Sequence, residues 1–349
     1  DEMRKTNWRA AIAAMTATLL LAACCEGRAA MGMTQIAASE ELGPVTVYYP
    51  SSSPSRPSGP TAWQLDVAEN GTPQRGNGRL VLISHGTGAS TWPYADQARA
   101  LVEAGFVVAA PLHRADNYLD HSDAPGALSR RPAELSRTID ALAADARFAP
   151  LLTLDRVGVF GMSAGGHTAL TAAGGRWSTA NFRRHCDQNL VADFQFCTGT
   201  ITQLNGGWFD GIKLWLARTI IGLRFTDEAM QGHEDPRFAA VVAAVPAAAI
   251  LDMASLATPR VPLGLVTASQ DRWLVPRFHS DRVLKACTTC EHLADLPTGG
   301  HGAYLSPLPP VFDGVLGEMM NDPPGFDRTR ELPPVHAKVA DFFVRHLLR

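Results

Sequence analysis

Hydrophobic positions along the chain fall into short continuous runs that alternate with longer amphipathic segments. The runs at 80–84, 106–110 and 263–268 are apolar at successive positions, as in strands that are buried on both faces of a sheet. Segments 94–104 and 132–146 instead place apolar residues at helical spacing. Strands that alternate with helices are typical of a parallel sheet, so we expect an α/β fold.

The alternation extends over most of the chain. Segment 45–49 is rich in β-forming residues and is expected to be an edge strand. Further strands are expected at 62–68, 157–160, 239–249 and 292–296, and further helices from Ser163 to about Gly174 and at 335–348. The sequence therefore predicts a mostly parallel central sheet flanked by helices.

A stretch of about 60 residues, 176–238, interrupts this order. It contains many aromatic residues and two of the cysteines. Insertions of this size in α/β proteins often form lids over the site, and we expect a lid-like segment here. The alternative is a subdomain that packs its aromatic side chains on itself.

The N-terminal segment has the pattern of an export signal. Basic residues at positions 4, 5 and 9 precede an apolar stretch at 10–23, which is too short for a comfortable membrane span. The stretch ends in Leu21-Ala22-Ala23-Cys24, which resembles a bacterial lipobox, where the cysteine becomes acylated. An ordinary secretory signal cleaved nearby is the alternative.

These features divide the chain into three parts. We expect residues 1–24 to be a lipoprotein-type signal peptide that ends at Cys24, 25–41 a tether, and 42–349 the folded domain with its insertion. The expected localisation is a membrane-anchored lipoprotein of the bacterial cell envelope, on its periplasmic or extracellular face. The lipid anchor would make the membrane a partner.

Composition and charge narrow the function. The chain has 349 residues, of which 46% are hydrophobic, so it can bury a large core. Its formal net charge of −3 gives no reason to expect a nucleic-acid partner. No H-E-x-x-H motif or comparable cluster is present, so no metal site is expected. The oligomeric state is not predicted.

Apart from Cys24 and Cys25, four cysteines remain: Cys186, Cys197, Cys287 and Cys290. Sequence proximity favours the pairs Cys186–Cys197 and Cys287–Cys290, although three pairings are possible. The C-x-x-C of the second pair could also be a redox motif or half of a zinc site. Export to an oxidising compartment favours structural disulfides.

The most informative motif is Gly161-Met162-Ser163-Ala164-Gly165. It follows an apolar run and precedes a helix-compatible segment, which is the context of a nucleophile elbow. Ser163 is therefore the candidate nucleophile. The alternative is an ordinary strand-to-helix turn with a serine N-cap, which explains the serine but not the surrounding glycines.

A serine hydroxyl needs a base, and the base needs an orienting carboxylate. His301, in a glycine-rich loop after a short strand, is the candidate base, and Asp271, which follows the strand at 263–268, is the candidate acid. Asp252 is the second choice for the acid. The other histidines considered are weaker candidates: His279 and His292 lie in a helix and at a strand start, His336 and His346 are expected at the surface, and His167 is expected to pack.

An oxyanion hole requires two backbone N–H groups. One is expected from Ala164, directly after the nucleophile. The other is expected from Thr87 in the His85-Gly86-Thr87-Gly88 loop, with Gly88 as the alternative. His85 precedes Ser163, which is the wrong order for the base, and is expected to be structural.

Together these motifs resemble the α/β-hydrolase superfamily. Segments 83–88, 107–113, 131–141 and 157–170, with the Asp271 and His301 loops, more closely resemble bacterial predicted dienelactone hydrolases, which are related to secreted platelet-activating-factor acetylhydrolases. The resemblance implies an α/β-hydrolase fold and a carboxylic ester hydrolase with a Ser–His–Asp triad, an acyl-enzyme intermediate and no cofactor. True dienelactone hydrolases use a cysteine nucleophile, so the lactone substrate does not carry over to Ser163.

The expected substrate is a small-molecule or lipid ester, and the acetylhydrolase resemblance suggests short acyl chains. Two alternatives stay open. One is an acyltransferase that uses the same triad. The other is a catalytically silent envelope lipoprotein that binds a ligand on a hydrolase scaffold.

Overall fold

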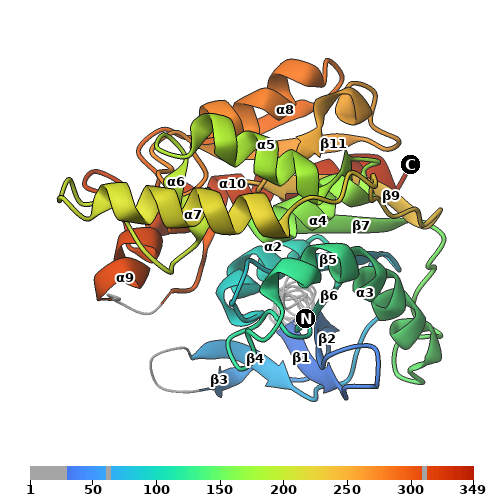
Figure 1. Ribbon diagram of the computed structural model, residues 1–349. Helices are drawn as coiled ribbons and strands as arrows, with labels where there is room; N and C mark the ends of the chain where they lie inside the picture. The colour runs from blue at the N-terminus through green and yellow to red at the C-terminus, as the bar shows by residue number, and fades with distance from the viewer. Residues whose placement is uncertain (1–29, 60–63, 309–312) are drawn as a thin grey trace, which may run out of the picture.

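The computed structural model of the chain describes residues 30–59, 64–308 and 313–349. Its main feature is one ten-stranded sheet (Figure 1). Eight of its strands overlap segments in which a strand was expected, and the two at 30–36 and 56–58 were not expected. In spatial order the strands are β12 (Glu291–Leu296), β11 (Leu263–Ala268), β9 (Phe238–Ala244), β7 (Val157–Met162), β5 (Leu80–Ser84), β6 (Val107–Pro111), β2 (Val45–Ser51), β1 (Ala30–Ile36), β4 (Leu65–Glu69) and β3 (Arg56–Ser58). From β12 to β6 all neighbours are parallel, whereas β2 is antiparallel to both β6 and β1.

Helices cover both faces of this sheet. One layer contains α2 (Ala95–Glu103) and α10 (Arg328–Leu347), and the other contains α3 (Ala124–Ala144), α4 (Ala164–Ala172) and α8 (Ser280–Ala286). The shorter helices are α9 (Gly314–Met320) and the 3₁₀ turns η2 (Trp92–Tyr94), η3 (Met253–Leu256), η4 (Pro276–Phe278) and η5 (His301–Tyr304). No helix in the described part of the chain combines the length and the apolar character needed to cross a bilayer.

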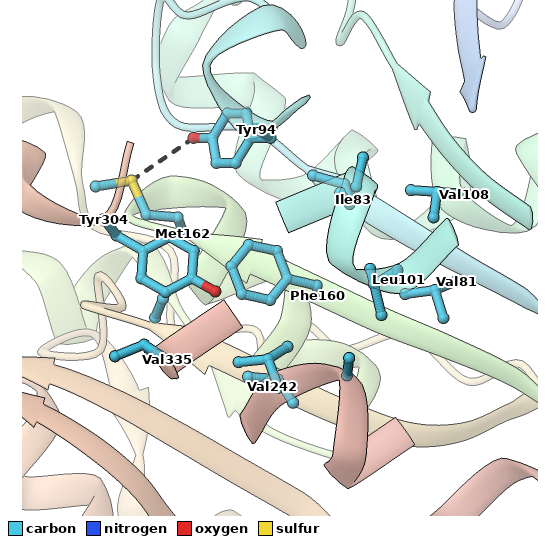
Figure 2. Packing of buried hydrophobic residues seen from close by; sticks show 14 of the residues in the cluster. Val81, Ile83, Tyr94, Leu101, Val108, Phe160, Met162, Val242, Tyr304 and Val335 are labelled. Atoms are coloured by element: carbon cyan, nitrogen blue, oxygen red, sulfur yellow. Dashed lines mark hydrogen bonds between the residues drawn. The ribbon is translucent and has the colours of Figure 1, made fainter. Parts of the chain in front are cut away.

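The parallel strands are buried on both faces because successive side chains enter different helical layers. Val81 and Ile83 of β5 pack toward α2 and α10, while Leu80 and Leu82 pack toward α3 and α4. Figure 2 shows the first of these layers, where Phe160 of β7 stacks on Tyr304 with ring centroids 5.2 Å apart. Continuous apolar runs were therefore a sound basis for predicting these strands.

Two expectations near the N-terminus are wrong. Segment 45–49 is not at an edge, because β2 has β6 on one side and β1 on the other. Residues 30–36 belong to the expected tether but form β1, which pairs with β2 along its whole length. A strand whose backbone groups are paired across seven residues is part of the folded sheet.

Two helices are longer than expected. Helix α3 begins at Ala124, eight residues before the predicted start, with Asp123 accepting a hydrogen bond from the Gly126 N–H as its N-cap. Helix α10 begins at Arg328 rather than at 335. Both contain internal prolines, which made their N-terminal halves look like loops.

The expected insertion forms a small layer outside the sheet. It consists of β8 (Arg176–Trp177), α5 (Thr179–Asn189), α6 (Phe194–Thr198) and α7 (Asp210–Arg224), and β8 pairs with β10 (Leu251–Asp252) of the main body. A Cys186–Cys197 disulfide joins α5 to α6, and a Cys287–Cys290 disulfide follows α8. Both pairings agree with those predicted from proximity. The insertion has its own small core, to which Phe194 and Ile221 belong.

Candidate active site

Ser163 lies on a sharp turn between β7 and α4. Its backbone has φ 59° and ψ −119°, a left-handed conformation that a non-glycine residue adopts only under strain. A Cβ on Gly161 would lie 1.9 Å from the Gly165 carbonyl oxygen, and a Cβ on Gly165 would lie 1.9 Å from the Ser84 carbonyl oxygen. The turn can therefore form only with glycine at both positions, as the elbow motif predicts.

The structure brings Ser163, His301 and Asp271 into one chain of hydrogen bonds. His301 Nε2 lies 3.0 Å from Ser163 Oγ, and His301 Nδ1 lies 2.8 Å from Asp271 Oδ2. A carboxylate can only accept, so Nδ1 carries the proton and Nε2 is free to accept from the serine hydroxyl. This is the arrangement that a general base requires.

Asp271 is fixed by its own loop. Its Oδ1 accepts hydrogen bonds from the backbone N–H groups of Trp273 at 2.8 Å and Leu274 at 2.9 Å. The carboxylate is buried, and its other oxygen faces His301. Asp252, the second choice for the acid, is exposed and instead caps η3 by accepting from the Ala254 N–H. Of the two candidates, Asp271 is therefore the one that lies beside His301.

The loop that carries His301 is held to the acid loop and to α9. The Gln270 N–H donates to the Gly299 carbonyl at 3.0 Å, which joins the two loops. A Cβ on Gly302 would lie 2.6 Å from Met320 Cα, so α9 packs closely on the His301 turn. These contacts keep the imidazole between its two partners.

The 85–88 loop lies beside the elbow. A Cβ on Gly86 would lie 3.5 Å from Ser163 Cβ. The Gly86 N–H donates to Tyr94 Oη at 3.0 Å, and the Gly88 N–H donates to Asp116 Oδ1 at 2.9 Å, so the Gly88 alternative is already engaged. Among the described residues no acceptor is found for the Thr87 N–H. Thr87 thus remains the candidate donor in this loop.

Ala164 is the first residue of α4, where backbone N–H groups lack partners within the helix. Tyr94 connects this turn with the 85–88 loop, because its hydroxyl accepts from Gly86 and donates to Met162 Sδ at 3.6 Å (Figure 2). Burial raises the pKa of Tyr94 to about 12, so the hydroxyl stays protonated and can donate. Sequence reasoning did not identify Tyr94.

A buried ion pair holds the backbone of the 85–88 loop in place, and sequence reasoning missed this pair as well. Arg131 of α3 and Asp116 are both fully buried, with Nη2 and Oδ2 2.7 Å apart. Arg131 also donates to the carbonyl oxygens of His85 and Gly86, while Asp116 accepts from Gly88. The pair thus fixes the backbone on both sides of Thr87. Arg131 lies just before the helix predicted at 132–146, so no pattern in the sequence pointed to the pair.

A second Ser–His–acid array lies nearby but is sealed off. Ser84 Oγ lies 2.8 Å from His113 Nε2, and His113 Nδ1 lies 2.5 Å from Glu134 Oε2. Ser84 and His113 are fully inaccessible, and burial holds the pKa of His113 well below its usual range. A buried array of this kind orients β5 and the start of the 85–88 loop. Of these two serines, Ser163 is the one that solvent can reach, since it is half-buried whereas Ser84 is fully buried.

Three histidines considered in the sequence have packing or hydrogen-bonding roles in this geometry. His167 is buried against Trp177, as expected, and His279 Nδ1 accepts from the backbone N–H groups of Ala248 and Ala249. His336 was expected at the surface but is buried beside Tyr304, because α10 turns it toward the core. In the described segments no group of three or more His, Cys, Asp or Glu side chains could hold a metal ion.

The chain matches no family model, and no curated protein matches it in sequence. Among solved structures, a ferulic acid esterase from Streptomyces cinnamoneus is similar with a TM-score of 0.56 and 17% identity, over 92% of this chain and 91% of that chain. The chain has an α/β-hydrolase fold. The strand–elbow–helix at Ser163 and the acid and histidine loops after β11 and β12 fit that fold. The closer resemblance to predicted dienelactone hydrolases stays a prediction.

Proposed function

We propose that the protein is a serine carboxylic ester hydrolase in which Ser163, His301 and Asp271 form the catalytic triad. The observation that carries the proposal is the pair of hydrogen bonds of 3.0 Å and 2.8 Å that His301 makes with Ser163 and Asp271. The printed name of the structural neighbour, an esterase, supports the same reaction class. The strained turn beneath Ser163 adds support because strain gathers at functional sites.

The proposed reaction has two stages. Ser163 Oγ attacks the ester carbonyl while His301 Nε2 takes its proton, and the N–H groups of Thr87 and Ala164 stabilise the oxyanion. The intermediate then collapses, and His301 gives the proton to the leaving alcohol. Water, activated by His301, attacks the acyl-enzyme and regenerates the free serine. Asp271 holds the imidazole and stabilises its cationic form.

The substrate and the location are further parts of the proposal. We expect short-chain acyl esters, and we propose that the protein is exported and anchored through Cys24, which lies outside the described residues. Labelling of cells with radioactive palmitate tests the anchor. Incorporation that is lost on Cys24→Ser supports it, and equal incorporation in both chains contradicts it.

Turnover of p-nitrophenyl acetate, butyrate and octanoate tests the reaction. Ser163→Ala is expected to lose about 10⁴-fold or more in kcat. The chain-length series then describes the acyl pocket. Undiminished turnover in Ser163→Ala would contradict the assignment. A wild-type protein that turns over none of the three esters would favour a silent binding scaffold.

A further inference from the structure

The insertion exposes an unusual amount of apolar surface. In the described residues 14 large hydrophobic side chains are exposed, and eight of them lie between positions 201 and 223. They are Ile201, Trp208, Phe209, Ile212, Trp215, Leu216, Ile220 and Leu223. Contiguous exposed apolar patches on soluble proteins mark interaction sites.

Most of these side chains form one stripe on α7 and the turn before it, which we term the α7 stripe: Trp208, Phe209, Ile212, Trp215, Leu216, Ile220 and Leu223. The opposite side of the helix, with Leu214, Ala217 and Ile221, packs on the core of the insertion. The helix is thus apolar on two sides, and the side that carries the α7 stripe faces solvent. Figure 1 shows α7 in yellow as an outer helix beside α5 and α6.

Among the residues that the structure describes, none covers the stripe. Trp208 is 84% exposed and Trp215 is 65% exposed. Tryptophan combines a large apolar ring with one N–H donor, and it concentrates where one end is apolar and the other is wet. Such a surface suits the boundary between water and lipid.

The charges beside the α7 stripe also favour a lipid surface as its partner. Asp210 is neutralised by Lys213 at 2.8 Å, whereas Arg218 and Arg224 are exposed and form no ion pair within the described residues. Helical periodicity places these two arginines on opposite flanks of the stripe. An apolar helix face bordered by arginines complements lipid with anionic headgroups. A second copy of the chain would bring like charges together instead.

We propose that the α7 stripe docks on an anionic lipid surface. The proposal does not depend on ester hydrolysis, since binding is measured without turnover. Contacts also tie the insertion to the catalytic edge of the sheet. Gln203 Nε2 in the α6–α7 connection donates to Glu318 Oε2 of α9 at 2.8 Å, and α9 packs on the turn that carries His301.

Depth-dependent quenching of tryptophan fluorescence tests the docking directly. The purified chain is mixed with vesicles of brominated phosphatidylcholine, with and without phosphatidylglycerol. Trp208→Phe and Trp215→Phe are each expected to remove much of the quenching while binding is kept, because phenylalanine is also apolar. Trp177→Phe, which removes a buried ring, is the matched control and is expected to leave quenching unchanged. Equal quenching in all four proteins would overturn the proposal.

Co-sedimentation with unbrominated vesicles gives the second readout. The variant Trp208→Ser/Trp215→Ser/Leu223→Ser is expected to bind at least roughly tenfold more weakly than the wild type. Val191→Ser/Met230→Ser, which changes exposed apolar residues of the insertion outside α7 and the α7 stripe, is expected to bind as the wild type does. Arg218→Glu/Arg224→Glu is expected to lose the preference for phosphatidylglycerol. A wild-type dimer that becomes monomeric in the stripe variant, without vesicle binding, would show a copy interface and overturn the proposal.

Discussion

Arg131→Met removes the guanidinium that joins the 85–88 loop to Asp116. Measuring both its kcat and its urea midpoint distinguishes a role in positioning that loop from a role in the stability of the fold. In the wild type Arg131 pairs with a fully buried carboxylate and donates to two backbone carbonyls, those of His85 and Gly86. Methionine fills similar space but donates nothing. Asp116 is then left as a buried charge without its cation.

The contacts of Arg131 allow two effects of the substitution to be sized, one on the free energy of unfolding and one on kcat. Breaking a buried ion pair by removing one partner costs about 3–5 kcal/mol of unfolding free energy. A typical domain is stable by about 5–15 kcal/mol, so the variant is expected to fold but to unfold at lower urea. Release of the 85–88 loop also moves the Thr87 N–H, and loss of one oxyanion donor costs about 10²–10³ in kcat. KM is expected to change much less.

The matched control is Arg130→Met. Arg130 is the neighbouring residue on α3, but it lies at the surface and pairs with exposed Asp123. Surface pairs contribute about 0–1 kcal/mol, so this variant is expected to match the wild type in urea midpoint and kcat. The assay is urea unfolding followed by fluorescence, with steady-state kinetics on p-nitrophenyl butyrate in the absence of urea. A folded Arg131→Met protein with a kcat near that of Arg130→Met would refute the positioning role.

Two further predictions follow from the site and from a buried histidine. Asp271→Asn is expected to lower kcat by about 10⁴-fold, because the imidazole loses its orienting carboxylate, whereas Asp252→Asn is expected to leave kcat unchanged; equal losses in steady-state assays would contradict the choice of acid. Burial lowers the pKa of His167 from 6.5 to about 3. Between these two pH values His167 therefore binds a proton in the unfolded chain but not in the folded chain. Its contribution therefore makes stability fall as pH drops from about 6.5 towards 3, by up to about 1.4 kcal/mol per pH unit. Urea midpoints measured across this range are expected to show a shallower slope in His167→Gln, and an unchanged slope would count against the assignment.

The sequence allowed the elements with local signals to be predicted. The elbow at Ser163 needs small residues at fixed positions, and the parallel strands are continuous apolar runs, so both can be recognised without the rest of the chain. The choice of His301 and Asp271 followed from their places after strands, and the structure brings His301 to Ser163 and Asp271 to His301. The disulfide pairs followed from proximity.

What could not be predicted depends on contacts between distant residues. Strand β1 has a weak pattern of its own and is defined by its pairing with β2. The Arg131–Asp116 pair and the Tyr94 hydroxyl contact the 85–88 loop only in the folded structure, so no spacing in the sequence indicates them. The start of α3 was missed because Pro132 resembles a helix start when it lies inside the helix.

The central claim is that Ser163 is an activated nucleophile, and labelling with a fluorophosphonate probe tests it most directly. The wild-type protein is expected to gain one adduct that peptide mass spectrometry locates on Ser163, and Ser163→Ala is expected to gain none. Ser84→Ala, which changes the serine of the sealed Ser84–His113–Glu134 array, is expected to be labelled like the wild type. An unlabelled wild-type protein, or an adduct located on Ser84, would contradict the account.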